Sequence, residues 1–119
     1  MTFPPIQIEA RYWEIVSTLL KRHVPKCEAW VFGSRAEGRA RPYSDLDLVI
    51  VGDGEVPFAT MAALADDLEH SDLPFKVDVL DWAVLTPAFR EAIEAGKVRV
   101  QSPTATGTER AGTETGRTV

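Results

Sequence analysis

Apolar residues recur with helical spacing in two parts of the chain. Between residues 8 and 23 they fall at intervals of three, four and seven, which places them on one face of an amphipathic helix that Pro25 ends. The stretch from Pro57 to His70 repeats this pattern. Thr86 and Pro87 have the character of an N-cap and a first helical residue, so a short third helix is predicted there, ending before Gly96.

Short aliphatic runs lie between these helices and predict strands. Three of them cover Glu28–Phe32, Leu46–Val51 and Phe75–Leu80, and Lys97–Val100 adds a short edge strand. The order α-β-β-α-β-α, with this last strand added, is typical of an α/β fold with one small sheet packed by helices. Only a dozen residues join the first two strands, which favours an antiparallel or mixed sheet, although the sequence leaves the strand directions open.

Composition restricts the class of protein. The chain has 119 residues and a net charge of -5, so one domain is expected, without a general attraction to nucleic acid or anionic membranes. A single cysteine excludes an intrachain disulfide, and the absence of a signal peptide or a long apolar run predicts a cytoplasmic protein. We assign residues 1–100 to the domain. Residues 101–119, with six Thr and three Gly, are predicted to form a disordered tail.

The segment between the first two strands carries the candidate chemistry. It reads VFGSRAEGRARPYSDLDLVIV and places Asp45 and Asp47 on one face at the start of a buried strand. Two carboxylates this close raise each other's pKa and destabilise the fold unless a positive charge lies between them. A solvated strand edge or a turn cap is the alternative explanation for such a pair.

The residues before the aspartates favour the explanation with a bound cation. Gly33 allows the backbone to approach a ligand closely, and Ser34 adds a hydroxyl beside its own N–H. A helix starting here would direct its free N–H groups at a phosphate. Arg35 could contact the same phosphate or form a structural pair with a nearby carboxylate. A phosphate site next to paired carboxylates predicts a nucleotide bound with Mg²⁺.

A third carboxylate is expected on a neighbouring strand. Asp78 lies within the apolar run of that strand, and Asp81 lies at its end on the opposite face. Because metal-assisted phosphoryl transfer uses carboxylates that converge from adjacent strands, we prefer Asp78 for this position.

Gly33-Ser34, ten residues, and then Asp45-Leu46-Asp47 resembles the DNA polymerase β-like nucleotidyltransferase superfamily. The wording FGSRAEGRARPYSDLDLVIV is similar to its minimal nucleotidyltransferase (MNT) branch, and VDVLDWAVLTPAFREAIEAGKV is a looser match. Members of this branch are small prokaryotic proteins, often paired with a HEPN-domain toxin. The resemblance therefore implies the antitoxin of a toxin–antitoxin pair.

The resemblance also implies roles for individual residues. Gly33 and Ser34 would hold the phosphates of a nucleoside triphosphate, and Asp45, Asp47 and Asp78 would bind one or two Mg²⁺ ions. The implied reaction transfers a nucleoside monophosphate, expected to be AMP from ATP, to a hydroxyl of the HEPN partner. The alternative is an inactive antitoxin that neutralises its partner by binding alone.

Overall fold

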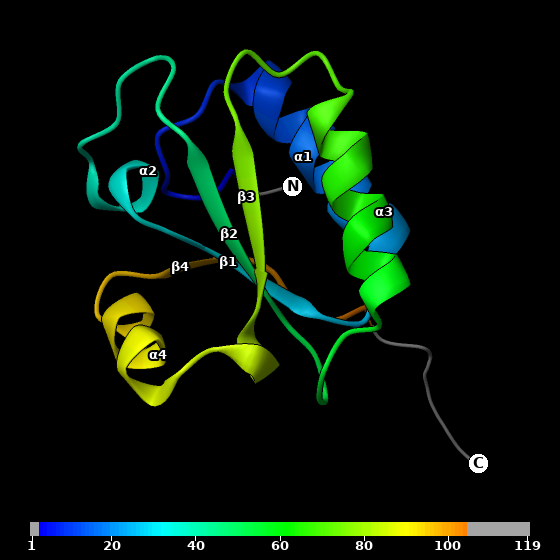
Figure 1. Ribbon diagram of the computed structural model, residues 1–119. Helices are drawn as coiled ribbons and strands as arrows, with labels where there is room; N and C mark the ends of the chain where they lie inside the picture. The colour runs from blue at the N-terminus through cyan, green and yellow to red at the C-terminus, as the bar shows by residue number, and fades with distance from the viewer. Residues whose placement is uncertain (1–2, 105–119) are drawn as a thin grey trace.

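A mixed sheet separates two layers of helices in the computed structural model, which describes residues 3–104. Helices α1 (Ala10–His23) and α3 (Phe58–Glu69) pack together on one face, and α4 (Pro87–Glu94) lies on the other (Figure 1). Two shorter helical segments, α2 (Ser34–Glu37) and the 3₁₀ turn η1 (Trp82–Val84), follow β1 and β3 respectively. The predicted α/β class is confirmed.

The sheet has the strand order β3-β2-β1-β4. Its strands are β1 (Glu28–Phe32), β2 (Leu46–Val51), β3 (Val77–Asp81) and β4 (Val98–Gln101). Strand β1 runs antiparallel to both β2 and β4, whereas β2 and β3 are parallel. The parallel pair requires a crossover, and α3 supplies it. The sheet is therefore mixed, as the short connection after β1 suggested.

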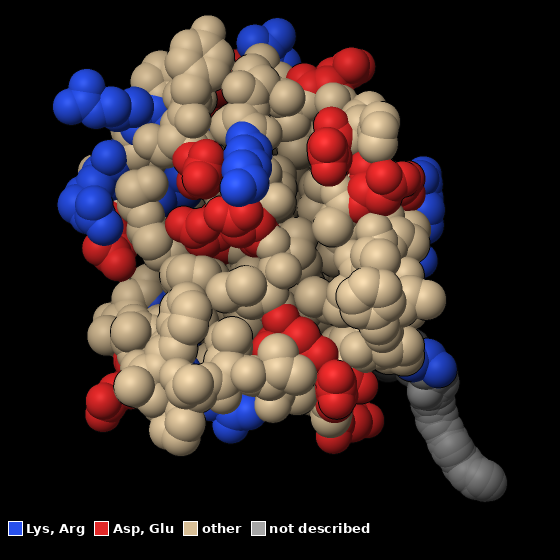
Figure 2. Space-filling view, in the orientation of Figure 1, with Lys and Arg blue, Asp and Glu red and all other residues tan. Residues whose placement is uncertain are grey.

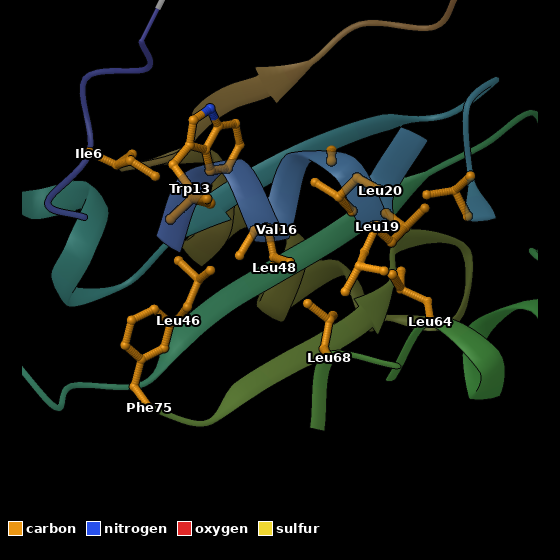
Figure 3. Close-up of a cluster of buried hydrophobic side chains, with 14 of the residues drawn as sticks. Ile6, Trp13, Val16, Leu19, Leu20, Leu46, Leu48, Leu64, Leu68 and Phe75 are labelled. Carbon is orange, nitrogen blue, oxygen red and sulfur yellow. The ribbon is translucent and has the colours of Figure 1, made fainter. Parts of the chain in front are cut away.

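The alternation of side chains along β2 assigns its two faces. Leu46, Leu48 and Ile50 are fully buried against the layer of α1 and α3, where Val16 and Leu64 pack in the same core (Figure 3). The residues between them, Asp47 and Val49, must then point to the face on which α4 lies.

A smaller core lies under α4. Trp30, Val49 and Ile93 are buried there, and the rings of Trp30 and Trp82 make an edge-on contact with centroids 4.8 Å apart. Thr86 caps α4 as predicted, because its Oγ1 accepts a hydrogen bond from the N–H of Phe89 at 3.2 Å.

The predicted elements are all present, with shifted boundaries. Helix α1 begins two residues later than expected, and β3 begins at Val77 and runs through Asp81. The predicted tail boundary at Gln101 is wrong: this residue ends β4, and its side-chain amide donates to the carbonyls of Val24 and Cys27. The rest of the predicted disordered tail, from residue 105, lies outside the described residues. Within residues 3–104, no helix is long and apolar enough to cross a membrane.

Candidate active site

Two of the predicted aspartates are direct neighbours across parallel strands. Asp47 on β2 is the register partner of Asp78 on β3, so both side chains leave the same face of the sheet. The core under α4 begins beyond them, at Val49, and leaves both carboxylates partly exposed. This arrangement places two negative charges side by side at an accessible edge of that core.

Gly33 faces the same carboxylate pair. Phe32, the residue before it, is the register partner of Asp47 on the antiparallel side of β2. A Cβ at position 33 would lie 2.6 Å from Oδ2 of Asp47, and the backbone angles there (φ 78°, ψ -156°) belong to a region that glycine alone adopts readily. Helix α2 then begins at Ser34, so its first N–H groups have no acceptor within the helix.

The surroundings of Asp47 disfavour the charged form of its carboxyl group. Burial raises its pKa, and the neighbouring Asp78 and Asp45 raise it further. Among the described residues, no hydrogen bond or ion pair to the Asp47 side chain is found. Asp47 is thus a partly buried carboxylate beside two others, with Gly33 next to it. Such a group offers the oxygen ligands that a hard divalent cation prefers.

Asp45 completes the acidic group from the loop before β2. It is close enough to Asp47 to contribute to that raised pKa, and it also lies near the Arg35 guanidinium, whose lowered pKa it partly offsets. In the described part of the chain, however, no three acidic, His or Cys side chains are close enough to form a set of metal ligands. Asp45, Asp47 and Asp78 thus supply suitable oxygen atoms, but their carboxylates do not converge on one point in this structure.

Arg35 has structural contacts in the folded protein. Its side chain is buried, with 5% exposure, and its guanidinium donates to the backbone carbonyls of Gln7 (2.6 Å), Pro42 (3.1 Å) and Ser44 (2.8 and 3.0 Å). It also lies 4.1 Å from the ring centre of Phe75. These contacts support the alternative of a structural role, with carbonyls rather than a carboxylate as partners, and the phosphate contact stays a prediction. It holds the loop that carries Asp45.

Asp81 also has a structural role. Its side chain is 8% exposed and accepts hydrogen bonds from the backbone N–H groups of Val56 (2.8 Å) and Ala83 (3.1 Å). Its place in β3 puts it on the face opposite to Asp78. This geometry supports the choice of Asp78 over Asp81.

Sequence reasoning missed Lys76. The ammonium group of this residue lies 3.4 Å from Oδ1 of Asp78 and forms the one ion pair found between a described cation and a candidate site aspartate. Arg39, in the loop between β1 and β2, pairs instead with Glu37 at 2.8 Å. Figure 2 shows acidic side chains gathered near the middle of this face, with a basic side chain against them. A lysine two residues before Asp78, on the same side of an extended segment, was the available signal.

The chain matches a family of nucleotidyltransferases. The family described as "Polymerase beta, Nucleotidyltransferase" matches residues 14–103. A relative from Haemophilus influenzae, named "Probable protein adenylyltransferase MntA", is 40% identical over 100 residues, which is 84% of this chain and 88% of the relative.

Solved structures share the fold at lower identity. A toxin–antitoxin crystal structure with AMP-PNP superposes with a TM-score of 0.64 at 21% identity, over 76% of this chain and 73% of the other. An MNT antitoxin in complex with a tri-AMPylated HEPN toxin of Shewanella oneidensis gives a TM-score of 0.57 at 19% identity, over 73% and 66%. The matched residues contain every candidate site residue from Gly33 to Asp78, and the chain belongs to the polymerase β-type nucleotidyltransferase family.

Proposed function

We propose that this protein is the antitoxin of a HEPN-domain toxin and that it transfers AMP from Mg²⁺-bound ATP to a hydroxyl group of that partner. The observation that carries the proposal is the register pair of Asp47 and Asp78 beside Gly33, in a chain 40% identical to a probable protein adenylyltransferase. The MNT antitoxin of similar fold is described in complex with a HEPN toxin that carries AMP groups.

In this proposal each residue of the site has its own role in the transfer. Gly33 and Ser34 bind the phosphates through backbone N–H groups and the Ser34 hydroxyl. Asp45, Asp47 and Asp78 would hold Mg²⁺, which neutralises charge on the triphosphate and on the departing pyrophosphate. The acceptor oxygen forms a bond to the α-phosphorus while the bond from that phosphorus to the bridging oxygen breaks. In this proposal Asp78 takes the hydroxyl proton as the general base.

The openness of the site suits a protein acceptor. The side chain of Asp78 is 42% exposed, so a group from outside the chain can reach it. An acceptor hydroxyl on another protein can therefore approach the α-phosphorus in line with the leaving group. Holding the two reactants in this geometry is the main contribution of positioning to catalysis.

The test compares catalysis with binding alone. The protein is co-expressed with its HEPN partner, and the partner's intact mass and toxicity are measured with wild type and with the double variant Asp45→Asn/Asp47→Asn. We expect wild type to add AMP to the partner and suppress its toxicity, and the variant to do neither. Full suppression by the variant without added mass would establish the alternative, an antitoxin that acts by binding.

A further inference from the structure

An aromatic pair borders the candidate site. The rings of Phe32 and Phe89 meet edge to face, with centroids 6.2 Å apart and planes at 87°. Phe32 ends β1 directly before Gly33 and is the register partner of Asp47, so its ring leaves the same face of the sheet as the acidic group. Phe89 reaches this position from α4.

Phe89 is less buried than the residue that anchors α4 on the sheet. Ile93, on the same helix, is 1% exposed and packs on Trp30 and Val49, whereas Phe89 is 41% exposed. Single exposed apolar side chains are common on protein surfaces, so exposure alone does not indicate a function. The position of this ring is more informative, because it extends an apolar surface up to Phe32 and the glycine of the phosphate site.

We propose that Phe89, packed edge to face against Phe32, provides the platform on which the base of the nucleoside triphosphate stacks. This inference rests on the proposed function, because it takes the phosphates to be held at Gly33 and Ser34, which directly follow Phe32 in the chain. The β3 side of the acidic group carries the charged pair of Lys76 and Asp78, and the loop on the other side carries Asp45 and Arg35. Toward Phe32 and Phe89 an uncharged planar base meets an apolar surface that is continuous with the small core under α4. In Figure 2 the central acidic group borders an uncharged surface that continues over α4.

The chemistry of the platform predicts how the base is selected. Phenylalanine has no hydrogen-bonding atoms, so stacking on it depends on the area of the base rather than on its edge pattern. Purine nucleotides should accordingly bind more tightly than pyrimidine nucleotides, by a moderate factor. The affinity for the triphosphate part should not depend on the aromatic pair.

Calorimetry with the full chain separates these two parts of the ligand. Mg²⁺ complexes of ATP, CTP and inorganic tripolyphosphate are titrated into wild type, Phe89→Ala and Phe89→Trp. We expect Phe89→Ala to weaken ATP binding about tenfold, CTP binding by less and tripolyphosphate binding not at all, and Phe89→Trp to retain ATP binding. Phe58→Ala is the matched control: Phe58 is 87% exposed at the start of α3, on the other helix layer, and its removal should change none of the three.

Each other outcome overturns the assignment. ATP affinity unchanged in Phe89→Ala, or ATP and tripolyphosphate weakened in parallel, would show that the base does not stack there. Loss of partner binding with ATP affinity intact would assign the aromatic pair to the HEPN interface. If wild type binds tripolyphosphate but gains nothing from the nucleoside, the platform fails while the phosphate site stands. If it binds neither ligand, the proposed function fails and the platform with it.

Discussion

Asp47 and Asp78 are register partners on parallel strands, so their like charges repel. The pairing places one carboxylate beside the other at the same level of the sheet, with Gly33 close to the first and the ammonium group of Lys76 close to the second. Without a cation between them the two carboxylates cost stability, and the proposed Mg²⁺ would remove this cost.

The pH dependence of stability should reveal the cost at Asp47. Its pKa is raised in the folded state above the ordinary value of 3.8, so the folded protein binds more protons than the unfolded chain just above that pH. Asp47 therefore costs stability progressively as pH rises through this window, and the cost is complete above the folded pKa. We expect Asp47→Asn, which carries no charge, to gain stability relative to wild type between about pH 4 and about pH 7. Urea unfolding across this range measures the difference, and a difference that shrinks with rising pH would contradict the assignment.

Mg²⁺ with ATP should make wild type more stable than Asp47→Asn. Because a ligand that binds the native state stabilises it by mass action, Mg²⁺ with ATP should raise the melting temperature of wild type. The same addition should have much less effect on Asp47→Asn. An equal shift in both proteins would place the nucleotide elsewhere.

Gly33→Ala should damage both the fold and the ligand site. The new Cβ would lie 2.6 Å from Oδ2 of Asp47, and alanine would be strained at the positive φ of this position. We therefore expect a loss of about 1–3 kcal/mol in the free energy of unfolding. The melting shift caused by Mg²⁺–ATP should be lost as well. Gly38→Ala is the control. Gly38 has a similar φ of +77° but open space around it, so its substitution should cost about 1–2 kcal/mol and leave the shift intact. Equal ligand responses in the two variants would argue against a site at Gly33.

Arg35→Met should destabilise the loop rather than remove a phosphate contact. The substitution leaves the carbonyls of Gln7, Pro42 and Ser44 without their donor, and we expect it to cost about 2–4 kcal/mol in urea unfolding. Tripolyphosphate affinity, measured below the unfolding transition, should fall only through the altered position of Asp45. An unchanged stability with abolished tripolyphosphate binding would restore the original assignment of Arg35 as a phosphate ligand.

Lys76→Met should tighten the binding of a divalent cation in the absence of nucleotide. The ammonium group 3.4 Å from Asp78 competes for the same carboxylates, so its removal should raise the affinity for Mn²⁺, a spectroscopic substitute for Mg²⁺, by a few fold at low ionic strength. The gain should shrink as salt is added. Lys21→Met, on the exposed side of α1, provides the control for net charge. Electron paramagnetic resonance of free Mn²⁺ gives the affinities, and weaker binding in Lys76→Met than in Lys21→Met would show that Lys76 supports the cation instead.

The order and approximate extent of the helices and strands could be predicted from the sequence, because they depend on periodicities that repeat every few residues. The spacing from Gly33 to Asp47 could be recognised for the same reason: a strand, a glycine turn and a second strand form one local unit. The boundary at Gln101 was predicted wrongly because its partners, the carbonyls of Val24 and Cys27, lie more than seventy residues away in the chain.

Only the tertiary structure decided what each polar side chain of this region contacts. Parallel pairing in register placed Asp78 beside Asp47, while the same strand turned Asp81 inward to cap backbone N–H groups. The contacts of Arg35 were also decided by folding. Three backbone carbonyls that come together in the folded protein accept hydrogen bonds from its guanidinium. Residue type and spacing define which chemistry a side chain can perform. Strand register and burial define which partner it meets, and these arise from contacts between segments that no local pattern encodes.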